Sequence, residues 1–149
     1  MSIESILTKD CVCAKMSASS KKKVLENIAQ LFSEHVAELN ADDLFTSFIN
    51  RERLGSTGIG HGIAIPHCRF DTGGKSYCAC ITLEESIDFD AVDNAPVDII
   101  FAMLVPTDAE SSHLQTLAGL AEKLQNPTFI AQIRRARSNE QLFEIAKKC

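Results

Sequence analysis

The stretch GSTGIGHGIAIPH, residues 55–67, combines a glycine-rich loop, a short apolar segment and a single imidazole at its end. Pro66 fixes its own φ and holds Ile65 extended, so the backbone that carries His67 is expected to be stiff. A neutral imidazole presents a nucleophilic lone pair near neutral pH, and the end of a strand is where open α/β sheets place their sites. His67 is therefore the first candidate for chemistry.

The alternating glycines Gly58, Gly60 and Gly62 fit neither of the usual nucleotide-binding loops. The pattern G-x-x-x-x-G-K-[ST] is absent, and the loop leads into a strand where a dinucleotide-binding fold requires a helix. Alternating glycines allow close backbone approach, with amide N–H groups free to bind an anion such as phosphate. They suit a hairpin loop with glycines at positive φ equally well, and the glycines alone leave both interpretations open.

Two further side chains, Arg51 and His113, lie on expected helices where an anion would be favoured. Arg51 follows Leu44 by seven residues and Phe48 by three, so it lies on the apolar stripe of its helix. Its guanidinium there needs an anionic partner or must extend to solvent. His113 falls in the first turn of a later helix, where backbone N–H groups favour an anion and a neutral imidazole. An exposed histidine without a role is the alternative for His113.

Composition limits the classes of function. A chain of 149 residues suits one domain with one substantial core. The net charge of −5 gives little attraction for a polyanion, so no nucleic-acid partner is expected, and the lysine run 21–23 is typical of a solvated helix start. The opening MSIESILTKD does not resemble a signal peptide, and no apolar run approaches the roughly 20 residues that span a bilayer, so a soluble cytoplasmic protein without membrane insertion is expected.

The six cysteines form no C-x-x-C pair. The pairs Cys11/Cys13 and Cys78/Cys80 alternate along expected strands, which directs both thiols of a pair to one face, where they are expected to pack into a core. A zinc site from Cys78, Cys80 and a histidine is the alternative, although it lacks the usual ligand spacing.

The elements expected around these residues indicate one layered α/β domain. Strands are expected near residues 11–13, 63–65, 77–83 and 97–106, and the nearly continuous apolar run 97–106 indicates helices on both faces of the sheet. Helices are expected from the turn SASS to about Val36, from Ala41 to Leu54, from a capping box at Ser112 and Gln115, from Pro127 to about Arg135, and after Ser138. The predicted order is β-α-α-β-β-β-α-α-α.

The run RERLGSTGIGHGIAIPHCR, residues 51–69, resembles the IIA domains of the fructose and mannitol class of the phosphoenolpyruvate phosphotransferase system. The likeness extends to SIDFDAVDNAPVDIIFAMLVP at 86–106 and HLQTLAGLAEKL at 113–124. It implies one type-2 IIA domain over residues 1–149, with a three-layer α/β/α fold and a mixed sheet. It also implies that His67 is phosphorylated and that His113 and Arg51 line its pocket. The segments SIESILTKDCV and RERLGSTGIG are most similar to the nitrogen-regulatory IIA proteins.

Phosphoryl transfer needs mainly positioning and charge stabilisation, which Arg51, His113, Thr57 and the amides of Gly58, Gly60 and Gly62 would provide, with His61 in support. No cofactor, nucleotide or metal is required.

The resemblance implies a histidine phosphocarrier whose donor is an HPr-like protein. Its output would be nitrogen- or potassium-related regulation through target proteins, such as potassium transport or sensor-kinase proteins. The first alternative is a sugar-specific IIA that donates to a separate IIB component. The second is a module that binds an anion at the glycine loop without turnover.

Overall fold

The computed structural model of the chain describes residues 3–107 and 111–148, with only the backbone described at 111–114. Along the chain the elements are α1 (Ile3–Ile6), β1 (Leu7–Met16), α2 (Lys21–His35), α3 (Ala41–Arg53), β2 (Gly58–Gly60), β3 (Ile63–Ala64), β4 (His67–Phe70), β5 (Tyr77–Ile87), β6 (Val97–Pro106), α4 (Ser111–Lys123), α5 (Pro127–Arg135) and α6 (Asn139–Ala146).

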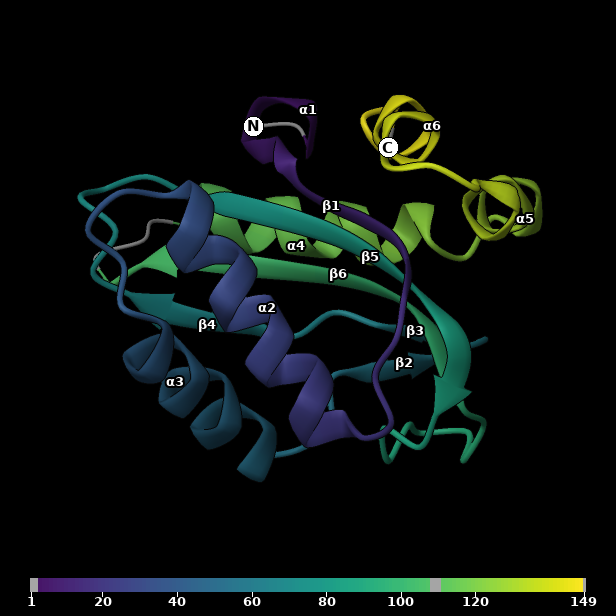
Figure 1. Cartoon of the computed structure of the whole chain (residues 1–149), viewed down its shortest axis with the longest axis horizontal. Coiled ribbons are helices and arrows are strands. Elements are labelled where there is room, and N and C mark those ends of the chain that lie inside the picture. The colour runs from purple at the N-terminus through teal and green to yellow at the C-terminus, as the bar shows by residue number, and fades with distance from the viewer. Residues whose placement is uncertain (1–2, 108–110, 149) are drawn as a thin grey trace.

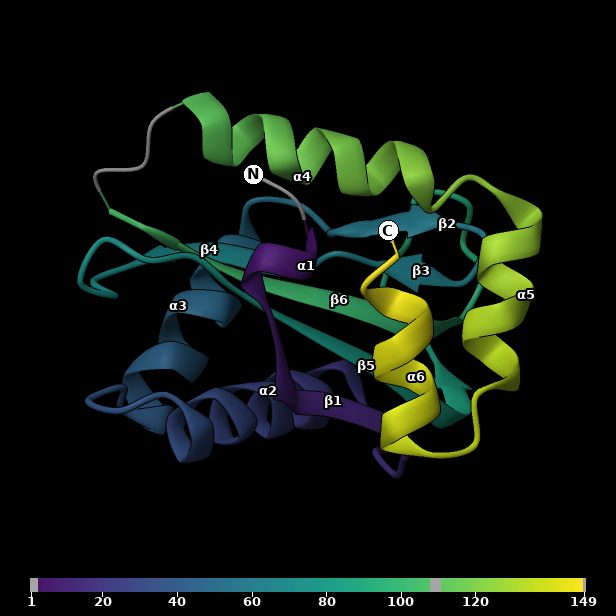
Figure 2. The same ribbon diagram turned by 90° about the horizontal axis from the view of Figure 1, so that it is seen from above.

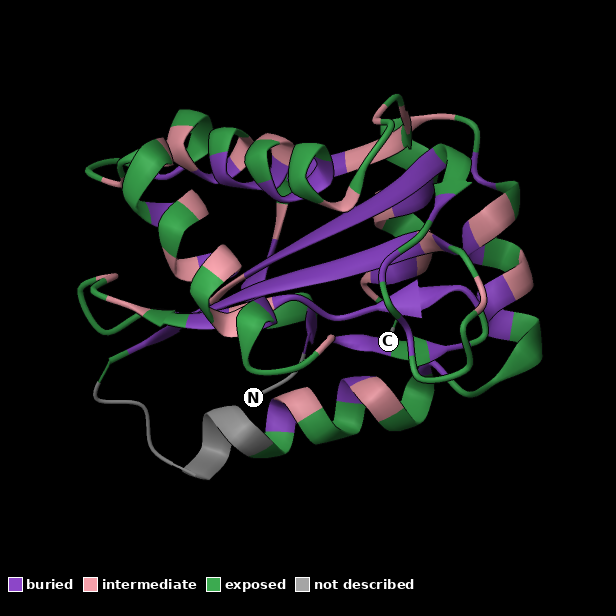
Figure 3. Cartoon of the chain, turned by 90° about the horizontal axis from the view of Figure 1, so that it is seen from below, coloured by how far each residue is buried: buried purple, intermediate pink, exposed green. Residues whose placement is uncertain are grey.

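These elements form three layers, as predicted. Helices α2 and α3 cover one face of the sheet, and α4, α5 and α6 cover the other, so that the sheet is the middle layer (Figures 1 and 2). Apolar side chains pack in two clusters, one on each face. In β6 the neighbours Ile100 and Phe101 belong to different clusters, which explains why the strand is buried along nearly its whole length (Figure 3) and why its sequence is apolar at almost every position.

The sheet within the described residues has six strands and is mixed. Its order is β1-β5-β6-β3-β2, and β4 also pairs with β6. The β1/β5, β3/β6 and β4/β6 pairs are parallel, whereas the β5/β6 and β2/β3 pairs are antiparallel. Because β4 pairs only with β6 in this part of the chain, it lies at an edge of the sheet near α3 (Figure 1).

Strands β3 and β4 are two parts of one extended segment along β6. Ile63 pairs with Ile99 and His67 with Met103, so the register stays constant across the gap between the strands. The ladder is interrupted at Pro66, which has no N–H to donate, but its carbonyl accepts from Met103 N at 2.9 Å. His67 therefore begins β4, which corrects the expectation that it follows the end of a strand.

The predicted helices and strands are confirmed in order, with two differences. A short helix, α1, precedes β1, and the segment around the glycines forms the strands β2, β3 and β4 where one strand is expected. Strand β3 corresponds to the strand expected at 63–65, whereas β2 and β4, of three and four residues, were not expected because such short segments barely show a period of two in the sequence. The capping box expected at Ser112 and Gln115 involves a side chain outside the described residues.

The helix starts follow from their capping side chains. Ser20, Asn40 and Ser138 each accept a hydrogen bond from the backbone N–H three residues later, at the starts of α2, α3 and α6. Asn126 caps α5, and Pro127 occupies its first turn.

The cysteines pack into the core as predicted. Cys11, Cys78 and Cys80 are fully buried, and none of the five cysteines within the described residues forms a disulfide. Burial, with a smaller contribution from the charge of Asp10, raises the pKa of Cys11 to about 12. These residues therefore act as small apolar side chains.

The glycine-rich stretch forms a tight β2/β3 hairpin, which is the second of the two interpretations left open by the sequence. Gly60, His61 and Gly62 all have positive φ, at 98°, 59° and 81°. Gly58 is required for a different reason: a Cβ there would lie 2.8 Å from Cβ of Ala91.

Gly58→Ala is expected to lower the free energy of unfolding by about 1–3 kcal/mol, because the backbone of Ala91 must move to admit a methyl group. Urea denaturation measures the change. The matched control is Gly119→Ala in α4, where a Cβ meets nothing within 4 Å and helix propensity should raise stability by about 0.5–1 kcal/mol. Equal changes in the two variants would show that Gly58 does not pack closely against Ala91.

Candidate functional site

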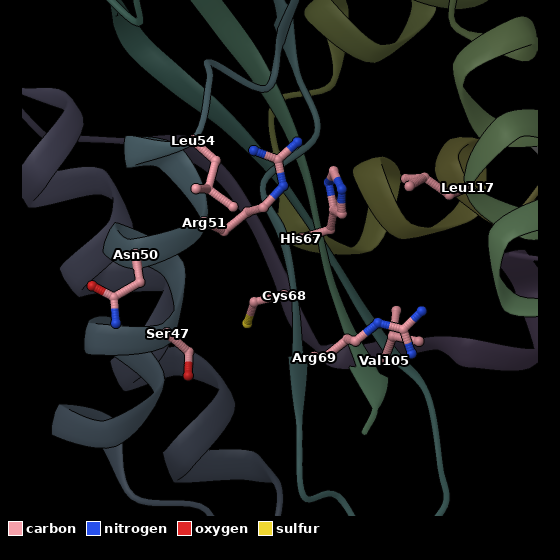
Figure 4. Close-up of a pocket in the computed structure, with 9 residues that line it drawn as sticks. All are labelled: Ser47, Asn50, Arg51, Leu54, His67, Cys68, Arg69, Val105 and Leu117. Carbon is pink, nitrogen blue, oxygen red and sulfur yellow. The ribbon is translucent and has the colours of Figure 1, made fainter. Parts of the chain in front are cut away.

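The imidazole of His67 is oriented by its own strand. Nδ1 lies 2.8 Å from the carbonyl oxygen of Ile65. A carbonyl oxygen only accepts hydrogen bonds, so the neutral ring carries its proton on Nδ1, and Nε2 keeps the lone pair. The ring is flanked by Arg51 from α3 and Leu117 from α4 (Figure 4).

The surroundings of His67 favour its neutral form. Burial lowers the pKa of His67 below its ordinary value of 6.5, and the nearby Arg51 guanidinium acts in the same direction. The hydrogen bond to Ile65 and the carboxylate of Glu52 oppose this lowering of the pKa without cancelling it. At neutral pH the ring is therefore the nucleophilic, uncharged imidazole.

Two cavities open beside His67, and their walls share Arg51, His67 and Leu117. The first has a volume of about 470 Å³, and its remaining lining residues are Ser47, Asn50, Leu54, Cys68, Arg69 and Val105. The second has a volume of about 290 Å³, and its remaining lining residues are Ser56, Thr57, Ile59, Ile65, Ala118 and Ala121. Figure 4 shows the first cavity between α3 and β4.

Arg51 is half-buried and lies in the last turn of α3. The guanidinium nitrogen Nη1 of Arg51 donates to the carbonyl of Gly55 at 2.9 Å, and this hydrogen bond fixes the direction of the side chain. A guanidinium has five N–H donors, so the group retains the capacity to bind the oxygens of an anion beside His67. The sequence prediction that Arg51 and His67 share a pocket agrees with this geometry.

Thr57 and Gly58 do not present free amide donors, contrary to the expectation for an anion-binding loop. The N–H of Thr57 donates to both oxygens of Glu52 at 3.2 Å, and its hydroxyl donates to the same carboxylate. The N–H of Gly58 donates to Oγ of Ser56 at 3.0 Å. These donors are used to close the loop after α3, because buried amides need partners.

The end of the hairpin lies away from His67. His61 is exposed and lines a third cavity with residues of α5, including Arg134. The guanidinium of Arg134 binds both carboxylate oxygens of Asp98, at 2.8 and 2.9 Å, and donates to the carbonyl of His61 at 2.8 Å. Gly62 packs against this ion pair and Gly60 against Asp93, so neither glycine lines the cavities beside His67.

His113 belongs to the first turn of α4, but its side chain lies outside the described residues. Its predicted place in the pocket therefore stays a prediction. No cluster of three metal-ligating side chains occurs among the residues whose positions are described.

The sequence interpretation missed Glu52 and Arg69. Glu52 follows Phe48 by four residues and Leu44 by eight, so helical periodicity already placed it on the buried stripe. Arg69 follows His67 by two residues in β4, and alternation along a strand places both on one face, where they line the same cavity. Leu117 had no comparable signal, because its position beside His67 depends on how α4 packs.

Cys68 lies next to His67 in the chain but on the opposite face of the strand. It packs into the cluster beneath α2 and α3, and burial raises its pKa to about 12. The thiol therefore stays protonated at neutral pH and does not compete with His67 as a nucleophile.

No helix in the described part of the chain is long and apolar enough to cross a membrane.

The chain shares 41% identity with a nitrogen regulatory protein of Pseudomonas aeruginosa, over 96% of this chain and 93% of that protein. It shares 27% identity with a fructose-specific EIIA component of Haloferax volcanii, over 96% of this chain and 93% of that protein.

The fold matches the crystal structure of the nitrogen regulatory protein IIA-Ntr from Neisseria meningitidis. The TM-score is 0.89 at 35% identity, over 96% of this chain and 97% of that one. Residues 5–149 match the family model described as phosphoenolpyruvate-dependent sugar phosphotransferase system, EIIA 2. The chain thus belongs to the type-2 EIIA family of the phosphoenolpyruvate-dependent phosphotransferase system.

Proposed function

We propose that the chain is a phosphocarrier that accepts a phosphoryl group on Nε2 of His67 from an HPr-like donor. The observation that carries this proposal is the hydrogen bond between Nδ1 of His67 and the Ile65 carbonyl, since it leaves Nε2 as the nucleophilic nitrogen. Family membership supports a role in phosphoryl transfer, and the nitrogen regulatory relatives support a regulatory output.

The transfer is a displacement at phosphorus. The lone pair of Nε2 attacks the phosphoryl group of the donor's phosphohistidine, the bond between phosphorus and the donor nitrogen breaks, and the donor ring recovers its electron pair. Charge spreads over the three phosphoryl oxygens in the transition state, where the guanidinium of Arg51 stabilises it. The Ile65 carbonyl stabilises the cationic ring character that develops as Nε2 forms its bond.

A partner must reach His67 over a surface that combines apolar and cationic side chains. Leu54 is 85% exposed and Ile59 is 36% exposed, and each lines one of the two cavities beside His67. Arg69 adds an exposed cation to the wall of the larger cavity. Phosphorylation would add about −1.5 to −2 charges at the centre of this surface, so a target that offers no cations would be repelled.

We propose that this change in charge is the regulatory signal: nitrogen- or potassium-related targets distinguish the phosphorylated from the unphosphorylated chain. The alternative is a sugar-specific IIA, which the 27% identity with the fructose-specific EIIA component favours. Incubating the phosphorylated chain with a fructose-class IIB protein separates the two, because efficient phosphoryl transfer to IIB supports the sugar-transport role.

His67→Ala is expected to abolish phosphorylation by phosphoenolpyruvate and the general phosphocarriers, because it removes the nucleophile. Acid-labile labelling, followed by mass spectrometry at neutral pH, measures it. His61→Ala is the matched control and should be labelled like the wild type, since His61 lines a different cavity. Full labelling of His67→Ala would assign the acceptor to another residue.

Arg51→Lys is expected to slow phosphoryl acceptance roughly ten- to hundred-fold at constant charge, because an ammonium lacks the planar fork that binds two oxygens. Rapid-quench kinetics with phosphorylated donor measures the rate. Arg53→Lys, an exposed position in the same turn, is the control and should leave the rate unchanged. An unaltered rate in Arg51→Lys would mean that the guanidinium does not contact the phosphoryl group.

The rate of phosphoryl acceptance is expected to fall as the pH is lowered, with a midpoint below pH 6.5. Protonation removes the lone pair of His67, and burial lowers its pKa in the folded chain from 6.5, so half of the rate is retained at a pH below that value. An NMR titration of the His67 ring, with a histidine peptide in the same buffer as reference, measures the midpoint. A midpoint at or above 6.5 would contradict the burial of the ring.

A further inference from the structure

A buried carboxylate lies close to the proposed phosphoryl-binding site at Arg51 and His67. Glu52 is the neighbour of Arg51 in the last turn of α3 and is only 9% exposed. Its oxygens accept the N–H and hydroxyl of Thr57, and Lys21 Nζ lies 3.0 Å from Oε2. Burying a carboxylate costs free energy unless such partners compensate its charge, so these contacts explain how the fold accommodates the buried Glu52.

Lys21 connects the carboxylate to two other segments. It lies in the first turn of α2, and its ammonium is half-buried, unlike the solvated lysine that the sequence suggested. The ammonium donates to the carbonyl of Phe89 at 3.4 Å, lies 4.8 Å above the ring of Phe89, and is 3.7 Å from the carboxylate of Asp90. The start of α2, the end of α3 and the loop before β6 therefore meet at one ion pair.

The contacts of Glu52 determine the path of the backbone that follows α3. The chain turns at Leu54 and Gly55, and the Glu52–Thr57 contacts close that turn from both sides. The carbonyl of Gly55, which holds the guanidinium of Arg51 at 2.9 Å, lies within the closed turn. Moving Thr57 away from Glu52 would displace this carbonyl and with it the Arg51 side chain.

The charges also complement one another. A lone carboxylate next to Arg51 would compete with a phosphoryl group for the guanidinium. Lys21 lies 3.0 Å from that carboxylate and offsets its charge, which leaves the positive charge of Arg51 for an anion at His67. Thus the same contacts provide both geometry and electrostatics.

We propose that Glu52, with Lys21 as its counter-charge, is a positioning residue for phosphoryl transfer and acts through Arg51. The proposal rests on the proposed function, because it assigns a role within that reaction. Glu52 touches neither the phosphoryl group nor the donor. Its contribution is to hold the turn at residues 54–57, and so the Arg51 guanidinium, in the arrangement that transfer requires.

A double-mutant cycle distinguishes positioning from general stabilisation. Single-turnover phosphorylation by excess phosphorylated donor is measured for the wild type, Glu52→Gln, Arg51→Ala and the double variant. The Glu52→Gln substitution is expected to slow phosphorylation roughly ten- to hundred-fold in the wild-type background and to have little further effect in the Arg51→Ala background. An equal slowing in both backgrounds would overturn the proposal, because Glu52 would then act independently of Arg51.

Lys21→Met provides a second test if Glu52→Gln fails to fold, since it removes the counter-charge, together with the Lys21 contacts to Phe89 and Asp90, but leaves the Glu52–Thr57 contacts in place. It should slow transfer in the wild type and not in Arg51→Ala, whereas the matched control Lys22→Met, at an exposed neighbouring position, should change neither. A Lys21→Met variant that transfers at the wild-type rate would contradict the proposal.

A measurement without phosphorylation separates this proposal from the proposed function. The Nε–H signal of Arg51 is followed by NMR, and Lys21→Met is expected to broaden or shift it while Lys22→Met leaves it unchanged. An unchanged signal in Lys21→Met would overturn the positioning role. Failure of the wild type to be phosphorylated on His67 would instead overturn the proposed function and leave the NMR result as the test of positioning.

Discussion

The phosphoryl transfer that we propose depends on one hydrogen bond, between Nδ1 of His67 and the carbonyl of Ile65 two residues earlier. The bond exists because residues 63–70 run extended along β6 with constant register, and because Pro66 between the two residues restricts the backbone. It selects the tautomer with the lone pair on Nε2. The sheet thus determines which ring nitrogen can act as the nucleophile.

The remaining parts of the site determine its charge. Burial keeps the imidazole uncharged at neutral pH, and Arg51 adds a positive charge beside it. Partly buried charges interact more strongly than solvated ones, so a single guanidinium in this position would stabilise an anion beside His67 better than it would at an open surface. We propose that the contacts of Glu52 position that guanidinium. The charges of Glu52 and Lys21 offset each other.

Much of the fold and part of the site could be predicted from the sequence. The apolar run 97–106 indicated a strand covered on both faces, and the spacing of Arg51 placed it on the apolar stripe of its helix, where it either binds an anion or extends to solvent. Strands β2 and β4, of three and four residues, were too short to show a period in the sequence. The ion pair between Glu52 and Lys21 joins residues far apart in the chain, so local periodicity could indicate that Glu52 is buried but not what compensates its charge.

The central claim is that the Ile65 carbonyl leaves Nε2 of His67 as the phosphoryl acceptor. Long-range ¹H–¹⁵N NMR of the phosphorylated protein, with ³¹P coupling to the ring nitrogens, tests it most directly. The hydrogen bond predicts phosphorus on Nε2 and a proton retained on Nδ1 of His67. Phosphorus on Nδ1 would contradict the account, because that nitrogen could not then donate to Ile65.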